Sequence, residues 1–291
     1  MYKRQLANVW VKAYRAVPRI NFPFTELDIA FSLCSATFLY LARLSFEETL
    51  IRVFQWPRDT PGTTEAVGSL AAMLHAMILV PGLFVALTTQ PYSPTEHISK
   101  APQWWQDLVS ALLQTCTGYM VYDSVVSFFM LKGFDLDGTD LLFLGHHLAT
   151  TIYMTQTRVI QAGHTSAMIC MLLGEFTNPF QNGRNVTNQA LQLACCNGIW
   201  MQKAHSIIEF LFAFFYFTMR SFVAPVFFLH VTIQLLIAPS RHNISLGLRI
   251  VWILLIWAVE VGSYDWIIQC WDILQTYREG FGGNWPIQKE L

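Results

Sequence analysis

The stretch that organises the chain is LLFLGHHLATTIYMTQTR, residues 141–158. It is apolar enough to predict a membrane-spanning helix, and the adjacent pair His146 and His147 then lies about a turn and a half inside that helix. Polar side chains at this depth are costly, so the pair requires a partner or a function.

A second apolar segment, residues 164–180, follows a short break in the chain. This segment and the residues just after it carry Glu175, Asn178 and Asn182. Asn178 and Asn182 follow Glu175 by three and seven residues, which predicts that all three share one helical face. We expect this face and the histidine pair to line a common intramembrane cavity.

The composition indicates a membrane protein. Of 291 residues, 54% are hydrophobic and 13% are charged, against roughly 25% charged residues in a soluble domain. The mean hydropathy is +0.39. We therefore predict an all-α, multi-pass transmembrane bundle without a separate soluble domain. A net charge of -1 excludes a broad nucleic-acid surface, which needs clustered Lys and Arg. The six cysteines lack metal-ligand spacing, and we interpret them as small core residues.

The apolar segments predict about seven crossings, with six and eight as alternatives. They cover residues 29–44, 66–87, 108–131, 141–158, 164–180, 205–238 and 246–271. The first segment is the least supported, and residues 205–238 are either a bent helix or a span with a partial re-entry. The expected organisation is a basic membrane-surface segment (1–27), a first span and link (28–65), the main transmembrane domain (66–272) and a tail (273–291). Orientation and oligomeric state stay open.

Further polar side chains lie in the other apolar segments. Intramembrane carboxylates are functional candidates by default, although each is also explained by protonation or by a hydrogen bond to an amide or a tyrosine. The candidates for catalysis are Asp123, His146, His147 and Glu175. The candidates for binding a substrate are His75, Tyr119, Tyr122, Thr150, Tyr153, Asn178, Asn182 and Arg220.

The histidine pair has two readings. A neutral imidazole is a general base near neutral pH and also attacks acyl carbons, and the alternative is that both rings hydrogen-bond between helices. The eight histidines form none of the boxes with which membrane desaturases hold iron, so no metal and no resident cofactor are expected. Span count alone leaves a transporter or a receptor open, but paired broken helices in matching halves are not evident.

Three motifs in order resemble the TLC-domain family, endoplasmic-reticulum membrane proteins that include the ceramide synthases. They are Gly118-Tyr119 with Tyr122-Asp123, then Gly145-His146-His147-Leu148, then GEFTNPFQNGR at residues 174–184. The last is similar to a Glu-x-Ser/Thr-x-Pro-Phe-x-Asn-x-Arg pattern of the smaller family members. The resemblance covers roughly residues 66–270.

In ceramide synthases the paired histidines transfer an acyl group from acyl-CoA to a sphingoid amine. By resemblance, His146 and His147 take those positions. Ceramide synthases also carry a His-Asp-x-x-Asp element, and this chain has LGEFTN at residues 173–178 in that region. The resemblance thus implies lipid handling in the first place and acyl transfer in the second.

The sequence leads to one hypothesis with two alternatives. The first is a TLC-type protein of the endoplasmic-reticulum membrane that binds acyl-chain lipids in an intramembrane cavity and acts in membrane lipid homeostasis. The second is an acyltransferase of ceramide-synthase type with acyl-CoA as co-substrate. The third is a membrane protein that binds a partner or cargo. Membrane lipids are the expected partners, and nucleic acid is not.

Overall fold

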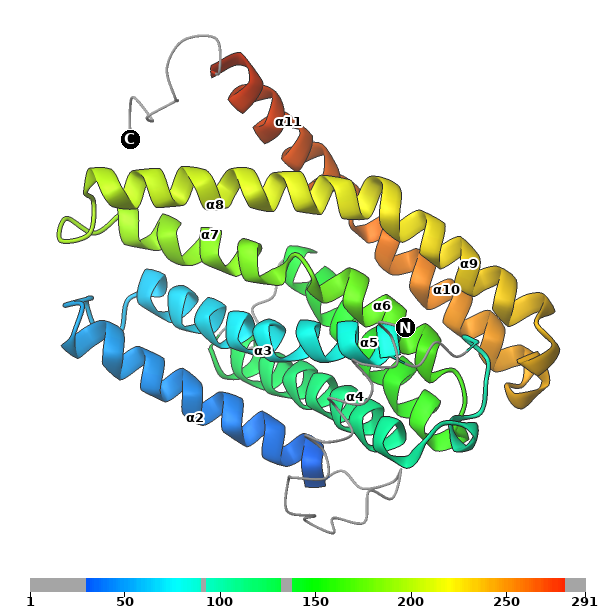
Figure 1. The fold of residues 1–291 in the computed structure, drawn as a ribbon. Coiled ribbons are helices and arrows are strands. Elements are labelled where there is room, and N and C mark those ends of the chain that lie inside the picture. Colours follow the sequence, from blue (N-terminus) through cyan, green and yellow to red (C-terminus); the bar gives the residue numbers. More distant parts are fainter. Residues whose placement is uncertain (1–29, 90–92, 132–137, 281–291) are drawn as a thin grey trace. The chain divides into compact units, whose positions relative to one another are not determined.

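The computed structural model describes residues 30–89, 93–131 and 138–280, and every regular element in these ranges is helical (Figure 1). The α-helices are α2 (Ala30–Arg52), α3 (Pro61–Thr89), α4 (Gln103–Asp123), α5 (Gly138–Ile160), α6 (His164–Glu175), α7 (Asn178–Leu191), α8 (Ile199–Thr218), α9 (Ala224–Ile237), α10 (Leu246–Gly262) and α11 (Tyr264–Gly280). Two π-helical segments, η2 (Ser124–Met130) and η3 (Met219–Val223), and two 3₁₀ turns, η1 (Ile98–Lys100) and η4 (Pro239–Asn243), complete the set. The predicted all-α fold is confirmed. The predicted basic segment 1–27 and the tail beyond residue 280 lie outside the described residues.

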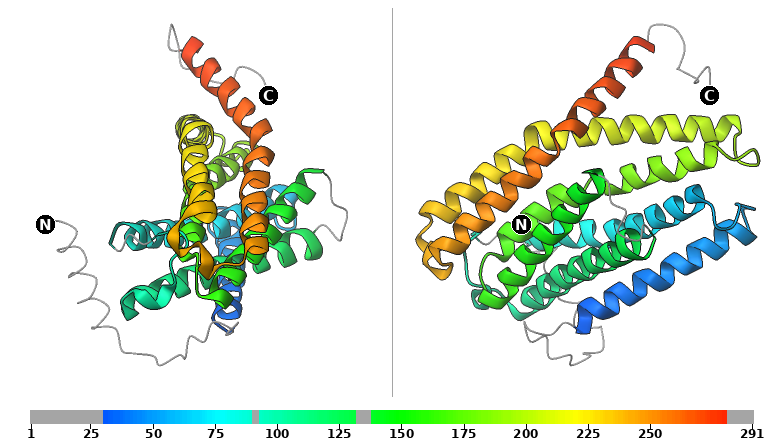
Figure 2. Two further views of the ribbon diagram at one scale, coloured as in Figure 1. Left: turned by 90° about the vertical axis from the view of Figure 1, so that its right-hand side faces the viewer. Right: turned by 180° about the vertical axis from the view of Figure 1, so that it is seen from behind.

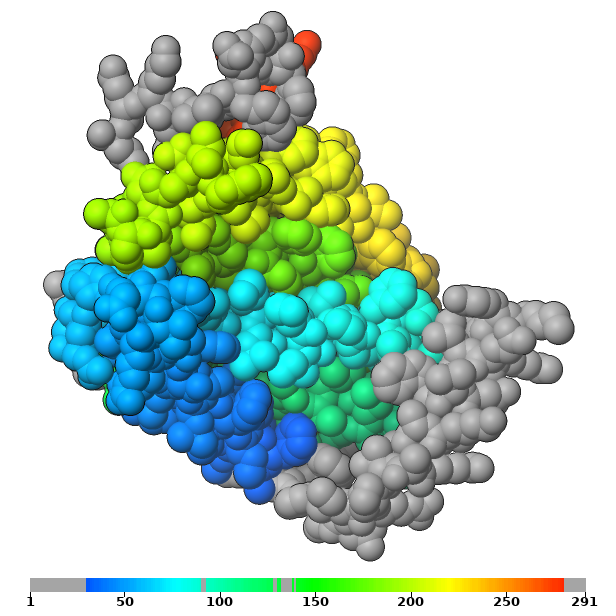
Figure 3. Space-filling model, turned by 60° about the vertical axis from the view of Figure 1, so that its left-hand side comes forward, coloured from blue at the N-terminus to red at the C-terminus, as the bar shows by residue number. Residues whose placement is uncertain are grey.

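Within the described residues, three helical runs are long and apolar enough to cross a membrane: Pro61–Thr89, Ile199–Ile237 and Leu246–Glu279. Hydrocarbon offers no hydrogen-bonding partner, so helices that satisfy their own backbone are the form such segments take. Large apolar side chains also point outward from the helices. On α2, whose surface is blue in Figure 3, Leu41 is 58% exposed. A multi-pass membrane protein follows, while the count of seven crossings remains a prediction.

The chain divides into two compact units, which are described separately. The first unit comprises residues up to Phe38, Ile78–Leu172 and Phe227–Trp257. The second unit comprises Leu39–Met77, Leu173–Val226 and the residues from Ala258 onward.

In the first unit, α4 packs against α5, and α2 approaches α4 closely at Gly118. A Cβ atom at Gly118 would stand 2.4 Å from the backbone oxygen of Ser32, so only glycine fits this crossing. The Ser35 hydroxyl donates to the Thr115 carbonyl at 3.3 Å, three residues before Gly118 in α4. The buried indole of Trp105 donates to the Ala86 carbonyl of α3 at 3.0 Å. Small residues at the contact and hydrogen bonds between helices allow apolar helices to associate without a hydrophobic driving force.

The same unit holds the paired helices α9 and α10, which run side by side in Figures 1 and 2. The Trp257 indole donates to the Thr232 hydroxyl at 3.1 Å. The buried Arg249 donates to the Leu235 carbonyl at 3.0 Å, near the end of α9. These bonds give the Trp257 indole and a terminal nitrogen of Arg249 a partner within a largely apolar hairpin.

In the second unit, α8 packs against both α7 and α11. Phe212, Ala213, Tyr216 and Cys270 form the buried centre of the contact with α11. Another cluster joins the end of α2, the start of α3 and α7 through Leu50, Trp56, Ala66, Val67 and Ala190. This unit therefore contains two apolar clusters, one between α8 and α11 and one that joins α2, α3 and α7.

The helix is interrupted between α6 and α7, so the prediction that Glu175, Asn178 and Asn182 lie on one continuous helix is wrong. Helix α6 ends at Glu175, and α7 begins at Asn178 with Pro179 in its first turn. Proline has no N–H to bond to the preceding turn, and it disfavours the helical conformation of the residue before it. It is tolerated at a helix start, which is where the structure uses it.

The long apolar run after residue 198 is a continuous helical path, the first of its two predicted forms. Helix α8 passes into the π-helical segment η3 and then into α9 without a loop. Pro225 follows η3 and lacks the N–H that an α-helix would direct at Ser221. The backbone N–H of Ala224 instead reaches back five residues to the Met219 carbonyl, so the wider turn accommodates the proline.

The cysteines are free thiols, but they are not all core residues as predicted. Cys116 and Cys270 are buried, whereas Cys34 and Cys195 are exposed. Exposure on a helix such as α2 is compatible with a lipid-facing surface, where a small thiol is as well accommodated as in a core.

Candidate functional site

A polar cluster in the first unit joins α4 and η2 to α5. The Nε2 atom of His147 lies 3.6 Å from Asp123 Oδ2, and its Nδ1 atom lies 3.3 Å from the hydroxyl oxygen of Ser124. The Ser127 hydroxyl donates to the other oxygen of Asp123 at 2.7 Å. His147 is buried, at 6% exposure, and the Asp123 side chain is about one-fifth exposed. One imidazole is thus held between a hydroxyl and a carboxylate.

Aromatic rings complete this cluster. Tyr119 meets His147 edge-on with ring centroids 6.2 Å apart, and Tyr122 lies 6.3 Å from Tyr119. The ring of His146 is 6.0 Å from that of His147. Both tyrosines are buried, and Tyr119 covers one edge of the imidazole. The π-helical segment η2 begins directly after Asp123, and such segments are frequent at functional sites.

This arrangement fits proton transfer. If the Nε2–H of His147 faces Asp123, its Nδ1 atom is an acceptor for the Ser124 hydroxyl, and the carboxylate stabilises the imidazolium that forms when the ring takes a proton. The distances are longer than in a tight hydrogen-bonded relay, as is common before a ligand arrives.

A separate polar cluster lies in the second unit around the predicted residue Glu175. Its Oε2 atom accepts a hydrogen bond from Asn178 at 2.7 Å and lies 3.6 Å from Nδ1 of His75. The Asn182 amide donates to the Asn178 carbonyl at 2.9 Å. His75 and Glu175 are both buried. The structure therefore joins four predicted residues, although the helix break rather than a shared helix face brings them together.

The remaining predicted residues have other surroundings. Tyr153 donates to the Ser166 hydroxyl at 2.7 Å and packs 4.5 Å from the Trp252 ring, and Thr150 is half-buried one turn before it in α5. Arg220 lies in η3 and pairs with Glu260 at 3.5 Å, with its guanidinium 5.7 Å from the Tyr216 ring centroid. These contacts account for Tyr153 and Arg220 as interhelical links within their own units.

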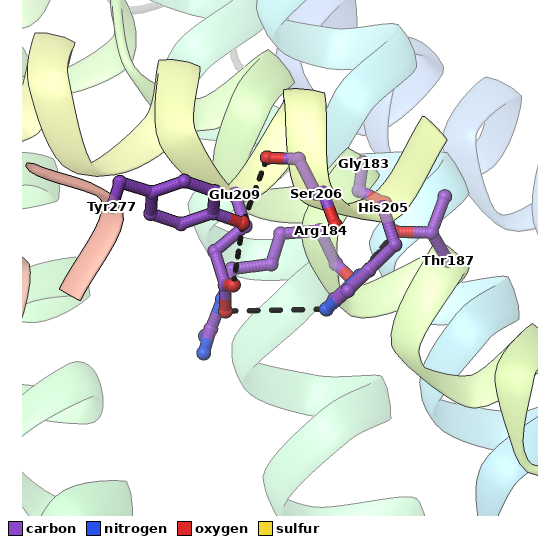
Figure 4. Close-up of polar contacts among 7 residues, drawn as sticks. All are labelled: Gly183, Arg184, Thr187, His205, Ser206, Glu209 and Tyr277. Atoms are coloured by element: carbon purple, nitrogen blue, oxygen red, sulfur yellow. Dashed lines mark hydrogen bonds and ion pairs between the residues drawn. The ribbon is translucent and has the colours of Figure 1, made fainter. Parts of the chain in front are cut away.

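The sequence reasoning missed a third cluster, which is drawn in Figure 4. Glu209 of α8 accepts from Arg184 Nε at 3.0 Å and from the Tyr277 hydroxyl at 3.2 Å, and lies 3.9 Å from Nε2 of His205 (Figure 4). The Thr187 hydroxyl lies 2.9 Å from the other ring nitrogen of His205. A signal was present, because His205 and Glu209 are four residues apart in an apolar run and thus on one helix face.

Comparison with known families decides what kind of chain this is. A family model described as the TLC domain matches residues 67–272, which is more than half of the chain. The chain belongs to the TLC-domain family. No individual curated protein matches it at a significant level.

The TLC domain includes all three clusters apart from Tyr277, which lies beyond the matched residues. Membership of the family supports a membrane location and a lipid-related function. Together with the three apolar helical runs, it makes membrane lipids the expected surroundings of the TLC domain.

Proposed function

We propose that this TLC-domain protein binds acyl-chain lipids in an intramembrane cavity and acts in lipid homeostasis of the endoplasmic-reticulum membrane. The observation that carries the proposal is the buried His147, held between Ser124 and Asp123. In an apolar helix domain a polar cluster of this kind is costly and marks a ligand or reaction pathway by default. The Tyr119 ring beside His147 offers a contact for an acyl chain, and the polar cluster offers partners for the polar end of the lipid.

The first test is lipid retention by the purified protein. Lipids are extracted after detergent exchange and quantified by mass spectrometry for the wild type, His147→Ala and Asp123→Asn. His242→Ala is the matched control, because His242 is exposed in η4. A content of bound acyl-chain lipid that falls by about one per protein in the two cluster variants, and not in the control, supports the proposal. Equal lipid content in all four proteins contradicts it.

Acyl transfer from acyl-CoA to a lipid amine is the second candidate, and the orientation of His147 favours it. The imidazole accepts the proton of the attacking amine, an amide C–N bond forms as the thioester C–S bond breaks, and the proton leaves on the CoA thiol. The carboxylate of Asp123 stabilises the imidazolium between these steps.

A turnover assay separates the two candidates. Acyl-CoA and a sphingoid amine are offered to the purified protein, and amide formation is measured. Turnover that disappears in His147→Ala and persists in His242→Ala establishes the transferase. Retained lipid without turnover supports binding alone, and a protein partner whose capture ignores the cluster variants would favour the cargo-binding alternative. Lipidomic profiles of cells with and without the gene then test the role in homeostasis.

A further inference from the structure

The cluster around Glu209 holds one arginine in a fixed orientation. Arg184 of α7 donates through Nε to Glu209 at 3.0 Å, and its guanidinium lies 5.9 Å from the ring centroid of Phe212. Glu209 is held in turn by Tyr277, whose hydroxyl also reaches the Ser206 carbonyl at 3.0 Å. Three helices therefore fix the plane of a single guanidinium group.

The terminal nitrogens of this guanidinium have no acceptor among the described residues. The Nε atom makes the hydrogen bond to Glu209, and the Arg184 side chain is 37% exposed. In Figure 4 the terminal nitrogens extend past the Glu209 carboxylate, away from Thr187 and His205. A guanidinium whose Nε is used and whose two terminal nitrogens are presented together is a fork for two oxygens on one centre.

An aromatic surface continues from the cluster along α8. The ring centroid of Phe215 lies 4.9 Å from that of Phe180 and 5.7 Å from that of Phe176. The ring centroids of Phe214 and Phe215 are 5.5 Å apart. Phe214 and Phe215 come one to two turns after Glu209 in the apolar run, whereas α7 continues beyond Arg184 through the polar residues Asn185, Asn188 and Gln189. A polar group bound at Arg184 would thus have the polar end of α7 on one side and the aromatic side chains on the other.

We propose that Arg184 binds the acidic headgroup of an acyl-chain lipid, a phosphate monoester or a carboxylate, whose chain lies along the aromatic surface of α8. The inference rests on the proposed lipid-binding function and names its ligand class and a site remote in sequence from His147. Glu209 and Phe212 are positioning residues in this proposal, because their contacts orient the guanidinium. An acidic lipid is favoured over a free anion because the aromatic wall offers nothing to phosphate alone.

The test is a competition measured by native mass spectrometry. The purified full chain receives equal amounts of dioleoyl phosphatidic acid, oleic acid and dioleoyl phosphatidylcholine, and the bound lipids are counted. The wild type is expected to retain one of the two acidic lipids over phosphatidylcholine by about tenfold, which corresponds to about 1.4 kcal/mol. Preference for phosphatidic acid identifies the phosphate as the ligand group, and preference for oleic acid identifies the carboxylate.

Variants locate the preference on the protein. Arg184→Gln is expected to abolish it, and Arg184→Lys is expected to retain part of it, because the charge remains without the two-nitrogen fork. Arg52→Gln is the matched control, since Arg52 is an exposed arginine of the same unit that pairs with Glu48. A preference that survives in Arg184→Gln overturns the proposal.

If Arg184→Gln does not fold, the wild-type competition alone tests whether the protein prefers an acidic lipid. Equal retention of the acidic lipids and phosphatidylcholine overturns this inference and leaves the proposed lipid-binding function intact. If none of the three lipids is retained, both fail.

Discussion

The imidazole of His147 on α5 lies 3.6 Å from the carboxylate of Asp123 at the end of α4. The two residues are 24 positions apart in the chain. The contact joins two of the motifs that mark the family. Adjacent residues of a helix point about 100° apart, and the ring of His146 lies 6.0 Å from that of His147.

This contact predicts energetic coupling between the two side chains. We expect Asp123→Asn and His147→Gln each to lower the free energy of unfolding, and the double variant to lose less than the sum by about 0.5–3 kcal/mol. The measurement is a denaturant titration of the four proteins in mixed detergent. Additive losses, within about 0.5 kcal/mol, would show that the two groups do not interact.

The carboxylate of Glu175 is predicted to stabilise the second unit. Glu175→Ala deprives buried His75 and Asn178 of this partner, and we expect a loss of about 3–5 kcal/mol in unfolding free energy. Glu175→Gln keeps an oxygen for the Asn178 amide, and a smaller loss of about 1–3 kcal/mol is expected. Asp272→Asn, an exposed carboxylate on α11, is the control and should stay within about 0.5 kcal/mol of the wild type. Equal effects of all three variants would rule out this role.

Gly118 is predicted to be required by the crossing of α2 and α4. A Cβ atom there would stand 2.4 Å from the Ser32 carbonyl oxygen and 2.8 Å from Ser35 Cβ, so Gly118→Ala should destabilise the protein by about 1–3 kcal/mol. Gly68→Ala is the matched control within α3, where a Cβ meets nothing within 4 Å, and it should stabilise by about 0.5–1 kcal/mol. Thermal unfolding of both variants is the measurement, and a stabilising Gly118→Ala would disprove the close approach.

Thiol reactivity in the turn before α8 is predicted to depend on pH in a defined direction. Burial and the neighbouring Cys195 raise the pKa of Cys196 above its ordinary value of 9.0, while a hydrogen bond from Trp56 lowers it. Only the thiolate is alkylated, so at pH 8 we expect Cys196 to react more slowly in the folded protein than in the unfolded chain.

Two variants test the causes of this shift by peptide-resolved iodoacetamide labelling. Cys195→Ala should move the alkylation profile of Cys196 toward lower pH, because it removes a raising contribution. Trp56→Phe should move the profile toward higher pH, because it removes the lowering one. Shifts in the reverse directions would contradict the assignment.

Much of the helical architecture was predictable from the sequence, because apolar length and polar punctuation are local properties. The helix α5 around His147 and the start of α6 at His164 agree with the predicted segments. The break before α7 was also encoded locally, in Pro179, but the apolar run through Phe180 concealed it. Periodicity arguments assume a continuous helix, and a proline at a helix start invalidates them.

The candidate sites were predictable only where one helix or one motif contained the information. Asp123 and His147 were both singled out, but the role of Ser124 depends on the π-helical turn that aims it at the imidazole. The hydrogen bond from Tyr277 to Glu209 links positions 68 residues apart, and no local pattern specifies such a contact. Arg184 alone resembles a helix-capping residue until its partner on α8 is known.

Photocrosslinking shows whether an acyl-chain lipid binds beside His147. A fatty-acyl lipid with a diazirine in its chain is irradiated with the protein in nanodiscs, and labelled peptides are mapped by mass spectrometry. We expect concentrated labelling of α4 and α5 next to Asp123 and His147, which is lost in His147→Ala and retained in His242→Ala. Labelling spread over outward-facing side chains such as Leu148, unchanged by His147→Ala, would contradict it.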